Sequence, residues 1–148
     1  MGKRRDGREA AIQFLFSRDL QGEQKPEDAE AFWTLHSAKA STRAYAESLI
    51  QGVLSHQDEI DSGITKLLEN FRFERLAAVD RNVLRVASYE LLYCQDVPAP
   101  VILNEAIDIA KALSAGESGA FVNGVLDKLA KALRKPEPKR PVEAASED

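Results

Sequence analysis

The sequence is poor in the residues that catalysis and covalent cross-linking commonly use. It contains one cysteine and two histidines among 148 residues. A single cysteine, Cys94, excludes a disulfide framework and a thiolate metal site within the chain, and it suits the reducing cytoplasm. The histidines, His36 and His56, fall on different predicted helices with ordinary apolar spacing, which is more typical of packing residues than of a catalytic or ligand-binding pair.

Long apolar runs and alternating patterns are also missing. No run of about 18 apolar residues exists, so we expect no membrane-spanning helix, and the charged N-terminus is not followed by the apolar core of a signal peptide. No segment alternates as a strand would. The glycine-containing turn at 114–119 lacks the Lys-Ser/Thr pair of a phosphate-binding loop. Because no acidic cluster has metal-ligand spacing with histidines, we expect no metal and no enzymatic activity.

The charge is unevenly distributed. The net charge is −4 and the pI is near 5.3, which argues against nonspecific coating of nucleic acid but leaves room for a local basic site. The N-terminal 18 residues contain two acids and five cations, which are Lys3, Arg4, Arg5, Arg8 and Arg18. Such a basic helix end can neutralise phosphates, although it is equally compatible with a simply solvated helix end.

Apolar residues spaced three and four apart predict helices through most of the chain. The predicted ranges are 4–20, a short helix from Pro26 to about 37, a long helix 42–70 that bends near 56–58, 78–95, 101–113, and a last helix capped by Ser118. The fold class is therefore all-α, a compact bundle of six to seven helices. One domain, 1–133, accounts for these helices, and the proline-rich, charged segment 134–148 is expected to be disordered.

Three local features carry further expectations. Gly7 lies inside the first turns of the first helix, so that end is expected to fray. Gly52 and Gly63 are expected to permit close approach of a neighbouring element. Arg81 and Arg85 follow one another at helical spacing and are expected to pair with Glu90 or with other acids.

Four segments resemble the NusB family of bacterial transcription antitermination factors. They are REAAIQFLFSRDL, VDRNVLRVASYEL, VPAPVILNEAIDIAK and SGAFVNGVLDK, and the resemblance covers about residues 4–133. It implies an all-helical fold of two packed sub-bundles without cofactor or catalysis. It also implies that the chain binds the boxA sequence of nascent RNA together with the ribosomal protein NusE. That complex helps RNA polymerase resist termination, chiefly on ribosomal RNA operons.

The resemblance also implies where the contacts lie. RNA-binding positions fall on Lys3, Arg4, Arg5, Arg8, Phe16, Glu117 and Phe121, and a NusE-binding position falls on Asp80. Phe121 is equally compatible with a core role, and an acid at Asp80 is favourable in a first helical turn in any case. Because Asp6 and Gly7 interrupt the basic end, we expect weak RNA binding in the absence of NusE.

Two alternatives stay open at this point. Certain ribosomal RNA cytosine methyltransferases contain a domain that resembles NusB, but they also need a methyltransferase domain downstream. A protein of another class, a helical protein–protein adaptor or a self-associating homodimer without RNA binding, would leave the basic helix end merely solvated.

Overall fold

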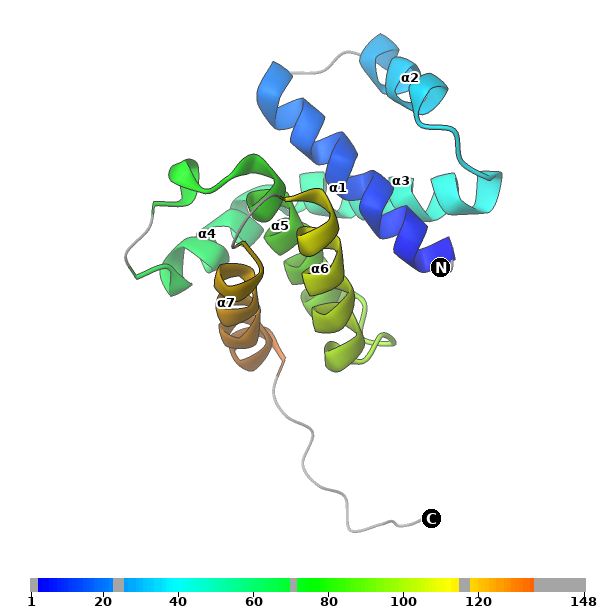
Figure 1. Ribbon diagram of the computed structural model, residues 1–148. Helices are drawn as coiled ribbons and strands as arrows, with labels where there is room; N and C mark the ends of the chain where they lie inside the picture. Colours follow the sequence, from blue (N-terminus) through cyan, green and yellow to red (C-terminus); the bar gives the residue numbers. More distant parts are fainter. Residues whose placement is uncertain (1–2, 23–25, 70–71, 115–117, 135–148) are drawn as a thin grey trace, which may run out of the picture.

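The computed structural model describes residues 3–22, 26–69, 72–114 and 118–134, and these residues form helices and turns (Figure 1). The elements are α1 (Lys3–Gln21), α2 (Pro26–Leu35), α3 (Ala40–Ser55), α4 (Gln57–Leu67), the short 3₁₀ turn η1 (Phe73–Arg75), α5 (Ala78–Tyr93), α6 (Ala99–Leu113) and α7 (Ser118–Leu133). The predicted all-α class is confirmed. None of the helices in these ranges is long and apolar enough to cross a membrane.

Helix α5 lies at the centre of the molecule. It packs against α1, α3, α4, α6 and α7, and its buried residues extend around most of its circumference. Helices α1 and α3 pack on each other on one side of α5, and α6 and α7 pack on each other on the other side (Figure 1). The wide apolar arc of this segment thus has a simple cause, since a helix covered on several sides needs apolar residues on each of them.

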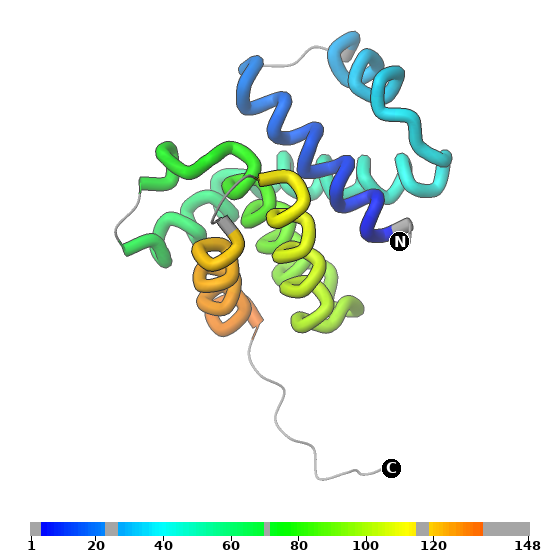
Figure 2. Tube along the Cα trace, in the orientation of Figure 1, coloured from blue at the N-terminus to red at the C-terminus, as the bar shows by residue number. Residues whose placement is uncertain are grey.

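Helix α2 lies at the periphery, on the far side of α1 and α3 from α7 (Figure 2). Its main anchor is aromatic, because the Phe32 ring packs edge-to-face on Phe14 of α1 with ring centroids 5.2 Å apart. Edge-to-face geometry is a favoured arrangement for aromatic pairs.

The predicted long helix 42–70 is interrupted, so the expectation of one continuous helix is wrong. The backbone leaves helical geometry at His56, which separates α3 from α4 with φ −122° and ψ 24°. The N–H of His56 still donates to the carbonyls of Gly52 and Val53. The apolar spacing continues across this break, because Ile60 and Ile64 of α4 enter the same core as α3.

Gly7 and Gly52 lie against neighbouring helices, whereas Gly63 does not. The expectation of a frayed α1 is wrong, because Gly7 is buried and a Cβ there would lie 2.6 Å from Tyr45 Cδ2 of α3. Gly52 likewise permits close approach, since a Cβ at that position would overlap the Tyr89 ring. A Cβ at Gly63 would meet no neighbouring element within 4 Å, so this glycine does not serve a close contact. The absence of a side chain at Gly7 and Gly52 therefore fixes the spacing of α1, α3 and α5.

Polar contacts complete the attachment of α1 and α7 to α5. Arg81 and Arg85 bind Asp19 near the end of α1, at 3.0 Å and 2.9 Å, and Arg85 also binds Asp61 of α4. Their partners are thus other acids and not Glu90. Arg134, expected in the tail, donates to carbonyls at the end of α5, and to that of Val97 in the following turn at 2.6 Å. The folded domain therefore includes Arg134, and the predicted disorder of 135–148 lies outside the described residues.

Candidate functional site

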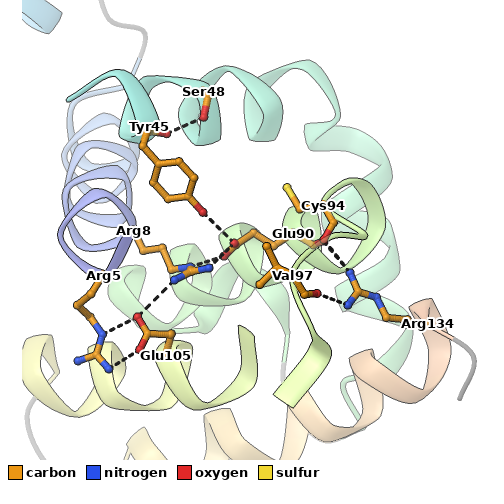
Figure 3. A network of polar contacts seen from close by, with 9 residues as sticks. All are labelled: Arg5, Arg8, Tyr45, Ser48, Glu90, Cys94, Val97, Glu105 and Arg134. Carbon is orange, nitrogen blue, oxygen red and sulfur yellow. Dashed lines mark hydrogen bonds and ion pairs between the residues drawn. The ribbon is translucent and has the colours of Figure 1, made fainter. Parts of the chain in front are cut away.

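The basic end of α1 presents its arginines in two directions. Arg4 is exposed, and its guanidinium carbon lies 5.6 Å from the centroid of the Tyr45 ring of α3. Arg5 and Arg8, one helical turn apart, both point toward α5 and α6 (Figure 3). The side chain of Lys3 and the whole of Glu117 lie outside the described residues, so the structure does not place these two predicted positions.

Arg8 is part of a buried network. Its Nε and Nη2 donate to the two carboxylate oxygens of Glu90, each at 2.8 Å, and the two side chains are 4% and 1% exposed. The Tyr45 hydroxyl donates to Glu90 Oε2 at 3.3 Å (Figure 3). Burial, followed by the negative charge of Glu90, raises the pKa of Tyr45 to about 12. A two-point arginine–carboxylate pair is geometrically specific, so this network fixes α1 against α3 and α5.

Arg8, a predicted RNA-binding position, is thus buried in this structure. Its guanidinium is satisfied in the interior, where a buried charge needs a close partner of opposite sign. The sequence does contain a signal for this pair, although the cation cluster alone does not reveal it. Glu90 lies within the apolar arc of its helix, and a buried acid in such a position requires a cation from elsewhere in the chain.

Arg5 occupies a similar but more open position. Its Nε and Nη2 donate to Glu105 of α6 at 2.7 Å and 2.6 Å, and Nη2 also donates to Asp108 Oδ2 at 3.0 Å. Glu105 accepts a further, longer bond from Arg8 Nη1 at 3.3 Å. Hydrogen bonding from Arg5 lowers the pKa of Glu105. The Arg5 side chain is 19% exposed, so part of its guanidinium faces solvent.

The predicted aromatic positions differ in their surroundings. Phe16 is partly exposed and lies outside the hydrophobic core cluster of the described residues. Phe121 packs against that core, and it also lines a groove of about 260 Å³ between the end of α4 and α7, with Leu67, Leu68 and Val125. The Phe121 side chain is therefore both a core contact and part of the surface of this groove.

Asp80, the predicted partner-binding residue, is only 6% exposed. It lies in the first turn of α5, where the helix dipole favours an acid. Its Oδ1 accepts a hydrogen bond of 3.0 Å from the Ser114 hydroxyl at the end of α6. The residue therefore joins two helix ends in this structure.

The polar groups described above bind one another within the chain. Among the described residues, no group of three or more His, Cys, Asp or Glu side chains could hold a metal ion. The fold and the site therefore describe an all-helical protein with a basic surface at one end of α1, where Arg4 lies over the Tyr45 ring.

The particular family follows from comparison with known proteins. The NusB family model matches residues 5–131, and the chain belongs to the NusB family. Its members are transcription antitermination factors, which are RNA-binding regulatory proteins and not enzymes. The family resemblance of the four sequence segments is thereby confirmed.

Individual relatives match over nearly their whole length. The chain is 45% identical over 133 residues to the transcription antitermination protein NusB of Sorangium cellulosum, covering 90% of this chain and 95% of the relative. It is 44% identical to NusB of Geobacter sulfurreducens, with 90% and 97% coverage. The likeness therefore extends over nearly the whole helical domain.

Solved structures agree with the fold. A structure of T. maritima NusB is 37% identical, with a TM-score of 0.76 and coverage of 88% of this chain and 92% of that one. A crystal structure of the antitermination factors NusB and NusE in complex with double-stranded RNA is 32% identical. Its TM-score is 0.80, and coverage is 89% and 98%.

Proposed function

We propose that this antitermination factor binds the boxA sequence of nascent RNA, notably from ribosomal RNA operons, as a complex with NusE. The complex acts with RNA polymerase in the cytoplasm. Membership of the NusB family and the likeness to the solved NusB–NusE–RNA complex support this proposal.

The observation that carries the RNA-binding part is the exposed end of α1. Arg4 lies over Tyr45, and Arg5 has a partly exposed guanidinium one residue further along. Arginines neutralise phosphates, and arginine and aromatic faces stack on unpaired bases. We assign direct contacts to Lys3, Arg4 and Arg5, with Phe16, Glu117 and Phe121 at the flanks. Arg8 lies beneath this surface and holds α1 in place through Glu90 of α5.

The charges around this surface support a role for a second subunit. Arg8 is neutralised by Glu90, and Arg5 by Glu105 and Asp108. Asp6 and Glu9 add acids on the same helix. Since counterion release scales with the number of phosphates neutralised, the chain alone should bind RNA weakly. NusE would then supply further contacts.

A binding titration tests this proposal. The affinity of a boxA RNA is measured for the chain alone, for NusE alone and for the pair, at several salt concentrations. The pair should bind more tightly than either component, and the affinity should fall as salt rises. A pair that binds no better than its components would contradict the proposal.

A charge reversal at Arg4 locates the contact. Arg4→Glu should lower the RNA affinity of the pair while the melting temperature stays the same. Arg43→Glu is the matched control, because Arg43 also lies over an aromatic ring, Trp33, at 5.1 Å. Equal losses from both variants would mean that a general charge effect, not a site at α1, is being measured.

The NusE contact is proposed at Asp80, on the resemblance alone. Asp80→Asn should weaken NusE binding with little change in helicity. Ser114→Ala removes the Asp80–Ser114 hydrogen bond but keeps the carboxylate, whereas Asp80→Asn removes the charge but keeps an oxygen that can accept this bond. If both variants weaken NusE binding equally, Asp80 acts through the helix junction and does not contact NusE.

A further inference from the structure

The guanidinium of Arg5 offers two edges for two-point binding of an anion. Glu105 occupies the Nε–Nη2 edge with both carboxylate oxygens, at 2.7 Å and 2.6 Å. Asp108 occupies half of the other edge, because its Oδ2 accepts from Nη2 at 3.0 Å. Within the described residues, no acceptor is paired with Nη1 of Arg5.

The two carboxylates are held with different strength. Glu105 is 20% exposed and accepts hydrogen bonds from both Arg5 and Arg8. Asp108, one turn further along α6, is 55% exposed, and it forms its ion pair with Arg5. Exposed ion pairs contribute little stability, because water and salt screen them. Asp108 can therefore leave Arg5 readily, whereas Glu105 stays in place.

We propose that Asp108 competes with an RNA phosphate for the Nη1–Nη2 edge of Arg5, while Glu105 holds the guanidinium through its opposite edge. This inference rests on the RNA binding proposed above. A phosphate bound at two points on that edge would meet the Asp108 carboxylate at Nη2, and two anions cannot share that donor. RNA binding thus replaces the Arg5–Asp108 pair, and Asp108 lowers the affinity for RNA.

This arrangement gives the two acids opposite roles. Removing the charge of Asp108 frees the phosphate-binding edge and should raise RNA affinity. Removing the charge of Glu105 loosens the Arg5 guanidinium and should lower the RNA affinity.

The test uses the full chain with NusE and a boxA RNA, at several salt concentrations. Asp108→Asn should raise the affinity about two- to fivefold, the upper part of the range expected for one exposed ion pair. The slope of log affinity against log salt should steepen by up to about 0.7, the value for one added phosphate contact on a single strand. Asp108→Glu, which keeps the charge, should behave like the unaltered chain.

Two controls separate competition from other causes. Asp127→Asn removes the same charge from an exposed pair with Lys131 on α7, and it should leave the affinity within about twofold. In an Arg5→Gln background, Asp108→Asn should have no effect, since the competition acts through Arg5. The melting temperature of Asp108→Asn should equal that of the unaltered chain.

The competition at Arg5 and the proposed function fail through different results. If the unaltered pair binds boxA RNA but Asp108→Asn binds equally or more weakly, the competition is overturned and the proposed function stands. An equal gain from Asp127→Asn, or a gain that persists without Arg5, also overturns it. If the unaltered pair binds no boxA RNA at any salt concentration, the proposed function fails and this inference fails with it.

Discussion

Arg5 and Arg8 lie one turn apart on the same helix and both bind carboxylates at two points, yet they occupy different environments. The Arg8 side chain is 4% exposed and its partner Glu90 is 1% exposed. The Arg5 side chain is 19% exposed, and one of its partners, Asp108, is 55% exposed. Burial makes a broken pair costly to the fold, whereas solvent makes a pair exchangeable.

A cluster of cations in a sequence is therefore not a single functional unit. Arg8 holds α1 against α5, and Arg5 stands where a ligand can reach it. Between them lies Gly7, which lets the Tyr45 ring approach α1. We therefore expect substitutions of these two arginines to lower the free energy of unfolding by different amounts.

The largest expected effect is on stability at Arg8. Arg8→Met leaves the Glu90 carboxylate buried without its cation, which should lower the free energy of unfolding by about 3–5 kcal/mol. Chemical denaturation measures this loss. Arg5→Met is the matched control on the same helix and should lie within about 1 kcal/mol of the unaltered chain. Similar losses from both variants would erase the distinction between the two arginines.

A smaller effect is expected at Gly7. Gly7→Ala places a methyl group 2.6 Å from Tyr45 Cδ2, and the ring must shift away from Glu90. Crowding of this kind should lower the free energy of unfolding by about 1–3 kcal/mol. Gly63→Ala is the control, since it has open space around it, and it should be neutral or slightly stabilising. A neutral Gly7→Ala would show that α1 does not depend on this close approach.

The smallest effect concerns pH. Folding raises the pKa of Tyr45 from 10.0 to about 12 through burial and the nearby Glu90. A raised pKa means that the contribution of Tyr45 to stability is complete below pH 10 and is lost as pH rises toward 12. Tyr45→Phe should therefore flatten the loss of stability in this alkaline window, as measured by denaturation at several pH values. An unchanged pH profile would mean that folding does not raise the pKa of Tyr45.

The helices could be predicted because their apolar spacing is local information. Prolines Pro98 and Pro100 marked the boundary between α5 and α6, which the structure places at 94–98. The sequence predicted a bend near 56–58, where the structure interrupts the helix at His56, but it did not predict a complete break, since Ile60 and Ile64 continue the apolar pattern beyond it. An apolar pattern records which residues face the core, and it can continue through a local break of the backbone.

The candidate site could be predicted only in part. Sequence identified the basic end of α1, but it could not separate Arg8 from Arg5. That separation depends on Glu90 and Glu105, which lie far along the chain and approach α1 only in the folded bundle. The same limit applies to Asp80, whose partner Ser114 is brought to it by the packing of α5 on α6.

The central claim is that RNA engages Arg5 and leaves the Arg8–Glu90 pair intact. Nuclear magnetic resonance of the arginine Nε–H groups tests it most directly, in isotope-labelled chain bound to NusE and titrated with boxA RNA. We predict that the Arg5 signal shifts as RNA is added, while the Arg8 signal keeps its position and its slow exchange with solvent. A shift or rapid exchange of the Arg8 signal, with Arg5 unchanged, would contradict the claim.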